Sequence, residues 1–299
     1  MKVMKPKTTV SLVLGSGGAR GLAHIGIIKW LVEHDYQINS ISGCSIGALI
    51  GGVYAAGRLT EFELWIKEID KFEIFSLLDL AWKSNGLVQG DKIINTLVAL
   101  LGDQKIEDLP LCYTAVAADI ENEKEVWINS GSLFEAIRAS ISLPLFFTPV
   151  HRNGVLLIDG GVLNPVPIAP TFGDNNDLTI AVNLGGAMIK KSVVAKTPVS
   201  EQSSTGFHSK IKGFINSFSN EESSQISSKD WGAYDIANQA FDAMQSTIAR
   251  QKLAAYPADV VIEIARNACG TLEFDRAGEM IELGYQAAER YFKISTEKE

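Results

Sequence analysis

Short apolar runs that end in glycine alternate along this chain with segments of helical periodicity. Residues 10–14 are almost entirely apolar and stop at a glycine, which is typical of a strand buried on both faces of a sheet. Apolar residues then recur at helical spacing up to residue 32, and residues 36–41 form a second apolar run. The pattern predicts a strand–helix–strand unit whose two strands are parallel neighbours, joined by a right-handed crossover.

The rest of the chain continues this alternation. Further helices are predicted at residues 46–56, 60–71, 89–101, 132–142, 233–255 and 275–292. Further strands are predicted at residues 111–119, 125–129, 154–158, 178–184 and 260–264. Thr60 with Glu63, and Ser132 with Glu135, have the spacing of capping boxes at two of the helix starts. The order of elements predicts an α/β fold, a three-layer α/β/α sandwich with a mostly parallel central sheet.

One polar tract interrupts the alternation. Residues 187–230 are rich in Ser, Thr, Asn and Lys and show almost no core pattern, so we expect a flexible insertion there. The chain is then expected to be a single domain, residues 1–299. Its core at 8–186 and its C-terminal helix–strand–helix at 231–295 lie on either side of the insertion in the sequence.

Two apolar segments each admit two interpretations. Inside the polar tract, five apolar residues share one helical face beside Lys210 and Lys212: Phe207, Ile211, Phe214, Ile215 and Phe218. They either pack on the protein body or stay disordered, or they form an anchor or lid that touches a lipid surface peripherally. Residues 72–82 are also unusually apolar and aromatic, and form either a core or interface segment or a lid that contacts an acyl chain.

Composition narrows the functional classes. The 299 residues are 46% hydrophobic and 21% charged, which is enough apolar material for a large buried core. A formal net charge of −8 and the lack of zinc-ligand spacing argue against a nucleic-acid partner. Three scattered cysteines indicate a reducing compartment, and no apolar run reaches the roughly 18 residues of a membrane span. We therefore expect a cytoplasmic protein whose membrane contact, if it has any, is peripheral at the inner membrane surface.

The clearest chemical motif is Gly43-x-Ser45-x-Gly47, which lies between a predicted strand and a predicted helix. That setting is typical of a nucleophile elbow, a sharp turn that projects the serine hydroxyl from the edge of a sheet. Glycines suit both flanks because a Cβ on either neighbour would clash in so tight a turn. The alternative is a glycine-rich turn capped by a serine, since this pattern is common by itself.

A second glycine loop precedes the elbow. Residues 15–21 read Gly-Ser-Gly-Gly-Ala-Arg-Gly and connect the first strand to the first helix. Consecutive backbone amides at a helix start bind anions, either a phosphate or the oxyanion of an acyl-transfer reaction. A dinucleotide fingerprint starting at Gly15 requires glycine where Arg20 stands, so nucleotide binding is the weaker alternative. Both loops open at the carboxyl edge of the sheet, which brings these amides near Ser45.

A serine nucleophile also needs a base. None of the four histidines has a convincing position, and only His208 follows Asp159 in the order of a usual triad. Asp159 ends an apolar strand and is followed by Gly160 and Gly161. Burial in an apolar cleft would raise its pKa from about 3.9 and make it a workable base near neutral pH. The residues therefore indicate a Ser45–Asp159 dyad, with a plain turn residue as the alternative reading of Asp159.

These motifs, in this order, resemble the patatin-like phospholipase family. The match rests on three sets of residues and on the blocks 138–149 and 164–165: Gly15, Gly17, Gly18, Arg20 and Gly21; Gly43, Ser45 and Gly47; Asp159, Gly160 and Gly161. Ser16 stands where many members of the family have glycine, and because its backbone amide remains we expect little effect.

The resemblance implies a hydrolase of lipid or other acyl esters that uses no metal and no cofactor. Ser45 would be the nucleophile and Asp159 the proton acceptor. The region of Gly17 and Gly18 would form the oxyanion hole, and Arg20 would order the loop or neutralise charge. A non-catalytic lipid-binding or regulatory protein on the same fold is the alternative.

Overall fold

The computed structural model describes residues 7–77, 90–144, 146–189 and 233–296 of the chain. The chain divides into two compact units, one formed by Met1–Ile189 with Gln239–Glu299 and the other by Lys190–Asn238. Of the second unit, the described residues contain only the start of one helix. The five apolar positions predicted as a lipid-surface anchor lie outside the described residues.

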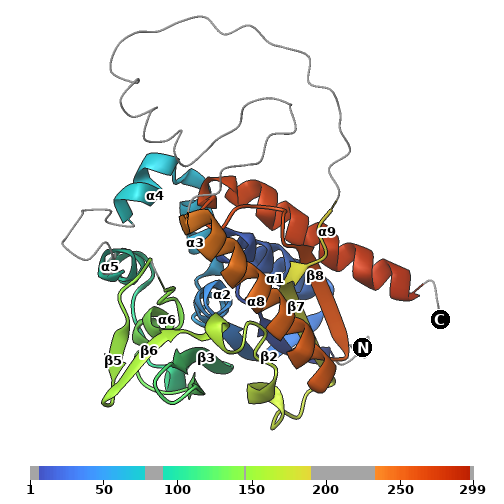
Figure 1. Cartoon of the computed structure of the whole chain (residues 1–299). Helices are drawn as coiled ribbons and strands as arrows, with labels where there is room; N and C mark the ends of the chain where they lie inside the picture. Colours follow the sequence, from blue (N-terminus) through green and yellow to red (C-terminus); the bar gives the residue numbers. More distant parts are fainter. Residues whose placement is uncertain (1–6, 78–89, 145, 190–232, 297–299) are drawn as a thin grey trace, which may run out of the picture. The chain divides into compact units, whose positions relative to one another are not determined.

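The first unit is built on one mixed sheet with helices on both faces (Figure 1). The described residues form eight strands in the order β5-β6-β3-β2-β1-β7-β8, with β4 paired to β3. The strands are β1 (Thr8–Leu14), β2 (Tyr36–Cys44), β3 (Cys112–Asp119), β4 (Lys124–Ile128), β5 (Val150–Arg152), β6 (Val155–Asp159), β7 (Leu178–Gly186) and β8 (Val260–Ala265). The helices are α1 (Ala23–Glu33), α2 (Ile46–Ala55), α3 (Leu59–Glu68), α4 (Lys71–Leu77), α5 (Asp91–Leu101), α6 (Leu133–Ser140), α8 (Ala233–Ala255) and α9 (Ala277–Thr296).

Parallel pairing occupies the middle of the sheet, and antiparallel pairing occupies one edge. β1 pairs in parallel with β2 and β7, and β2–β3 and β7–β8 are parallel as well. β3 runs antiparallel to β4 and β6, and β6 runs antiparallel to β5. The predicted three-layer α/β fold and its parallel first two strands are confirmed. Strand β5 was not predicted, because three residues are too few to show a period.

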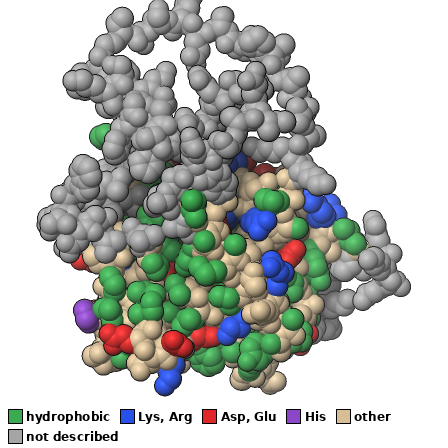
Figure 2. Space-filling view, viewed as in Figure 1, with side chains coloured by type: hydrophobic (Ala, Val, Ile, Leu, Met, Phe, Trp, Pro, Cys, Tyr) green, Lys and Arg blue, Asp and Glu red, His purple; other side chains and the backbone are tan. Residues whose placement is uncertain are grey.

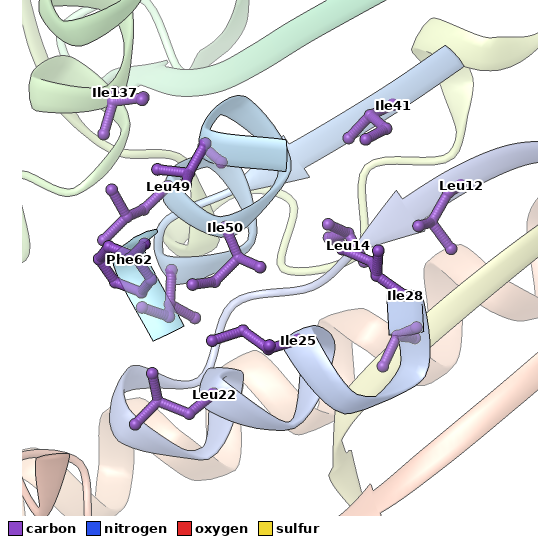
Figure 3. Packing of buried hydrophobic residues seen from close by; sticks show 14 of the residues in the cluster. Leu12, Leu14, Leu22, Ile25, Ile28, Ile41, Leu49, Ile50, Phe62 and Ile137 are labelled. Carbon is purple, nitrogen blue, oxygen red and sulfur yellow. The ribbon is translucent and has the colours of Figure 1, made fainter. Parts of the chain in front are cut away.

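Alternate residues of the central strands enter two different cores. Leu12 and Leu14 of β1 lie toward α1 (Figure 3) and belong to the larger cluster of buried apolar residues. Val13, between them in the sequence, packs instead with Ala181 of β7 and Ala249 of α8. A strand with apolar residues on both faces needs a covering layer on each side, which α1 and α8 provide.

The register of the parallel strands brings the two predicted loops to one edge. Leu14, the last residue of β1, lies opposite Gly43 near the end of β2. The glycine loop at residues 15–21 and the turn at Ser45 therefore leave the sheet from adjacent positions at its carboxyl edge, as expected for a ligand-binding edge of such a sheet.

The capping prediction is confirmed at one helix and wrong at another. At the start of α6, Ser132 accepts a hydrogen bond from the amide of Glu135. α3 begins at Leu59, so Thr60 lies inside the helix rather than at its cap. The residue three positions later in that predicted box, Glu63, is mostly buried and pairs with lysines instead, because tertiary ion pairs outweigh a local capping pattern here.

Apolar and charged side chains are interspersed on the face seen in Figure 2. The apolar stretch predicted at 72–82 begins as α4, in which Phe72 is 80% exposed and Ile74 is buried; residues 78–82 lie outside the described residues. Among the described helices, none combines the length and the apolar character needed to cross a membrane.

The close packing of α1 on α9 yields a stability prediction. An ideal Cβ on Gly284 of α9 would lie 1.9 Å from the backbone oxygen of Ala23, whereas one on Gly278 of the same helix meets nothing within 4 Å. We expect Gly284→Ala to lower the free energy of unfolding by about 1–3 kcal/mol, because the helices must move apart. Gly278→Ala should be neutral or stabilising by up to about 1 kcal/mol, since alanine favours a helix. Urea unfolding measures both, and equal stability of the two variants would contradict this packing.

Candidate active site

Ser45 occupies a strained turn between β2 and α2. Its φ of 56° and ψ of −126° lie in a region that costs a non-glycine residue about 1–3 kcal/mol. An ideal Cβ on Gly43 would lie 2.5 Å from the oxygen of Gly47, and one on Gly47 would lie 2.1 Å from the oxygen of Leu14. The backbone amide of Ser45 donates to the hydroxyl of Ser140 at 2.9 Å. The strand–turn–helix setting expected for the motif is therefore present.

The side chain of Ser45 contacts a buried carboxylate. Its hydroxyl donates to Oδ2 of Asp159 at 2.5 Å. Asp159 ends β6 and is completely buried. Its other oxygen, Oδ1, accepts a hydrogen bond from the amide of Gly161 at 2.7 Å and a weak one from the thiol of Cys44 at 3.9 Å. The structure thus brings together the serine and the aspartate that lie 114 positions apart in the sequence.

Burial controls the protonation of this pair. Removal from water raises the pKa of Asp159 to about 6, although hydrogen bonds from Ser45, Gly161 and Cys44 act in the opposite direction. Burial, and next the charge of Asp159, raise the pKa of the Cys44 thiol well above its usual value, so Cys44 stays protonated. Asp159 is consequently ionised at neutral pH and still basic enough to accept a proton from a hydroxyl.

The remaining motif glycines pack the loops against one another. An ideal Cβ on Gly21 would lie 2.2 Å from a methyl carbon of Ile46, the residue after the elbow serine. One on Gly161, in the loop after Asp159, would lie 2.6 Å from the hydroxyl of Ser16 in the first glycine loop. Each loop therefore sets the position of another, which explains why glycine recurs in all three motifs.

The first glycine loop has both occupied and available amides. The amides of Gly15, Ser16 and Ala19 donate to backbone carbonyls of neighbouring segments at 2.8–3.1 Å. Within the described part of the chain, the amides of Gly17 and Gly18 have no acceptor. Gly18 has a φ of 57°, which glycine adopts without strain. The loop is held at both ends and leaves two donors in its middle.

Arg20 fixes the shape of this loop. Its side chain is buried, and Nε donates to the oxygen of Gly17 at 3.1 Å. The two terminal nitrogens donate to the oxygen of Arg266 at 2.6 Å and to Oδ1 of Asp242 at 3.3 Å. The guanidinium is thus directed at the protein itself, and the loop-ordering role that the resemblance implied for Arg20 stays a prediction.

Two further side chains support the loop. Nε2 of His24 lies 2.9 Å from the oxygen of Gly15, and because a carbonyl only accepts, Nε2 carries the proton. Burial lowers the pKa of His24 to about 4, so the ring is neutral at pH 7. Nε2 of Gln245 on α8 donates to the hydroxyl of Ser16 at 3.2 Å. The sequence did not single out Gln245, because no local pattern connects residues 229 positions apart.

The other histidines do not reach the site. His34 stacks on Trp30 with ring centroids 3.9 Å apart, His151 is exposed on β5, and His208 lies outside the described residues. Among the described residues, no group of three or more His, Cys, Asp or Glu side chains is arranged to hold a metal ion. A water-sized cavity of about 10 Å³ between Ser16, Arg20 and Gln245 is too small for an acyl chain.

Comparison with known proteins identifies relatives of this chain. The family of patatin-like phospholipases matches residues 12–172. An uncharacterized NTE family protein of Mycobacterium tuberculosis (strain ATCC 25618 / H37Rv) is 38% identical over 319 residues, covering 92% of this chain and 89% of the relative. Lysophospholipase NTE1 of Saccharomyces cerevisiae is 31% identical over 186 residues, which cover 60% of this chain and 11% of the yeast protein. The crystal structure of VipD from Legionella pneumophila has a TM-score of 0.48 at 14% identity, covering 97% of this chain and 67% of VipD.

The match over residues 12–172 identifies the chain as a lipid hydrolase of the patatin type. The chain belongs to the patatin-like phospholipase family. The resemblance recognised from the three motifs is confirmed, and the matched region contains both Ser45 and Asp159.

The buried carboxylate leads to a prediction for stability. The pKa of Asp159 rises from 3.8 unfolded to about 6 folded, so its favourable contribution is complete below pH 3.8 and is lost as the pH rises through 6. We expect Asp159→Asn to raise the free energy of unfolding at pH 8 by up to about 3 kcal/mol, and the gain to vanish below pH 4.

Asp119→Asn is a matched control, for which we expect the opposite change in stability at pH 8. Hydrogen bonds, the first of them from the Asn122 side chain, lower the pKa of Asp119, so Asp119→Asn should reduce stability at pH 8. Chemical denaturation at pH 4, 6 and 8 measures both variants. A loss of stability in Asp159→Asn at pH 8 would mean that the hydrogen bonds to this carboxylate outweigh its burial.

Proposed function

We propose that this protein is a serine esterase that cleaves fatty acyl esters of lipids, as a phospholipase A or lysophospholipase does, with a Ser45–Asp159 dyad. The observation that carries the proposal is the 2.5 Å hydrogen bond from the strained serine to a fully buried carboxylate. Membership of a phospholipase family and the similarity to a lysophospholipase support the class of substrate.

The geometry supports a two-step reaction. In the first step Ser45 Oγ attacks the ester carbonyl while Asp159 takes the hydroxyl proton, and the proton then passes to the departing alcohol. In the second step Asp159 takes a proton from water, the water oxygen attacks the acyl-enzyme, and the fatty acid leaves as Ser45 regains its proton. Asp159 is ionised again at the end of each cycle, and each bond that breaks is matched by a bond that forms.

The negative charge that develops on the carbonyl oxygen needs donors. The amide of Ser45 is taken by Ser140, so the elbow cannot use it for this purpose. The unpaired amides of Gly17 and Gly18, together with the positive N-terminal end of α2, suit the task. Arg20 contributes by holding the carbonyl of Gly17, which sets the orientation of the peptide that carries the Gly18 amide.

Two finer assignments remain part of the proposal. Peripheral membrane contact through the apolar face at residues 207–218 and a cytoplasmic location stay predictions from sequence. The strain at Ser45 and the burial of the Asp159 carboxylate both lower stability, and a non-catalytic protein on this fold would need neither of them.

A labelling experiment tests the nucleophile and the base. A fluorophosphonate probe should label wild-type Ser45, and the protein should turn over a chromogenic short-chain ester and a lysophospholipid. Ser45→Ala should abolish both signals, and Asp159→Asn should reduce kcat by about 10³-fold or more, because the base is lost while the shape is kept. Ser42→Ala serves as the matched control, since its buried hydroxyl has no partner among the described residues. Full turnover by Asp159→Asn would contradict the proposed role of Asp159 as the base.

The pKa of Asp159 predicts the pH dependence. Only the ionised carboxylate accepts a proton, so log kcat/KM should rise with a slope of one toward pH 6 and be flat above it. Steady-state kinetics with a neutral ester from pH 4.5 to 9 measures this profile. A single inflection above pH 7 would indicate a different base.

A further inference from the structure

The last turn of α6 carries a hydroxyl that supports the nucleophile from inside the protein. Ser140 is completely buried. Its Oγ accepts the hydrogen bond from the Ser45 amide at 2.9 Å and donates to the oxygen of Val116 on β3 at 2.6 Å. Because the proton of the hydroxyl is committed to Val116, a lone pair is necessarily left for Ser45. The strained turn is thereby tied to a central strand.

The same turn also holds the other member of the dyad. The carbonyl of Ser142 accepts a hydrogen bond from the backbone amide of Asp159 at 3.0 Å. Gly160 packs directly on the Val116 carbonyl, which an ideal Cβ there would approach to 2.2 Å. The Ser140 hydroxyl and the loop after Asp159 therefore share one peptide group as their support.

A buried arginine stabilises this turn. Nη1 of Arg138 donates to the hydroxyl of Ser142 at 2.7 Å, and that hydroxyl donates back to the Arg138 carbonyl at 2.8 Å. Nη2 donates to the carbonyl of Thr148 at 3.2 Å, and Nε donates to Asp91 at 3.3 Å. The end of α6 is consequently fixed to two neighbouring segments, which makes it a rigid platform for both halves of the dyad.

We propose that Ser140 is a positioning residue for the nucleophile, and this rests on the proposed role of Ser45 in ester cleavage. It acts through the Ser45 backbone and does not touch the substrate. Its completely buried hydroxyl is the acceptor for an amide at the start of α2 that the helix itself leaves unpaired. Without it, the amide loses its partner, the turn relaxes, and the Ser45 oxygen moves away from Asp159.

Two variants that each lose one buried hydroxyl separate positioning from stability. Ser140→Ala deletes the hydroxyl that contacts Ser45, whereas Thr171→Val deletes a buried hydroxyl that donates only to the carbonyl of Ile168 at 2.8 Å. We expect Ser140→Ala to lower kcat by about 10- to 100-fold at an unchanged KM and to slow fluorophosphonate labelling in parallel. Thr171→Val should keep kcat within about twofold, because its hydroxyl contacts neither Ser45 nor Asp159. The inflection in the pH profile of Ser140→Ala should move above pH 6, because the lost Ser45 hydrogen bond is one of the contacts that lower the pKa of Asp159.

Hydrogen–deuterium exchange gives a readout independent of activity. Exchange in the peptide spanning residues 40–47 should accelerate in Ser140→Ala and stay unchanged in Thr171→Val. Ser140→Cys preserves the shape with a weaker acceptor and should give an intermediate kcat, so it replaces the alanine variant if that one does not fold.

The outcomes distinguish the two proposals. An inactive and unlabelled wild type would overturn the proposed function, while exchange would still decide the contact of Ser140. An active wild type together with unchanged kcat and exchange in both Ser140 variants would overturn only the role of Ser140. Equal losses of kcat in Ser140→Ala and Thr171→Val would likewise reduce Ser140 to a structural residue.

Discussion

The left-handed backbone of Ser45 is the constraint on which the other parts of the site depend. A residue with a side chain is held at a φ of 56° between a buried strand and a buried helix. The turn closes only because the Gly47 peptide approaches Gly43, and the Leu14 peptide approaches Gly47, more closely than a Cβ on either glycine would allow. Burial of the large hydrophobic core on which α2 packs offsets the cost of the Ser45 backbone strain, about 1–3 kcal/mol. The strain at Ser45, the proposed nucleophile, therefore depends on the packing of the whole sheet edge.

Among the described residues, no cation contacts the carboxylate of Asp159. The carboxylate receives a hydroxyl, an amide and a thiol, whereas the two buried arginines of the motif region pair elsewhere, Arg20 with Asp242 and Arg138 with Asp91. An arginine beside Asp159 would lower its pKa and weaken it as a base. Neutral donors fix the carboxylate in place and leave its pKa near 6, where proton transfer to and from a hydroxyl is feasible.

Sequence reasoning located the turns that consecutive residues encode and missed contacts between distant segments. The contact between Ser45 and Asp159 was predictable because glycines mark the tight turns that each requires, and the catalytic roles of the two residues stay a prediction. The capping role predicted for Glu63 was wrong, since lysines of α1 and α3 take its carboxylate. Gln245 and the Ser45 contact of Ser140 could not be predicted, because each meets its partner only after α8 or α6 packs against the sheet edge.

The contact between Ser140 and Ser45 explains why the first glycine loop is so heavily supported. The Ser45 amide is bonded to Ser140, so in the proposed reaction the oxyanion would need donors from another segment. A free loop would place such donors poorly, but the first glycine loop is held by Arg20 at Gly17 and by neutral His24 at Gly15. The proposed nucleophile and the proposed oxyanion donors are therefore held by separate elements, which lets each be rigid without competing for the same amide.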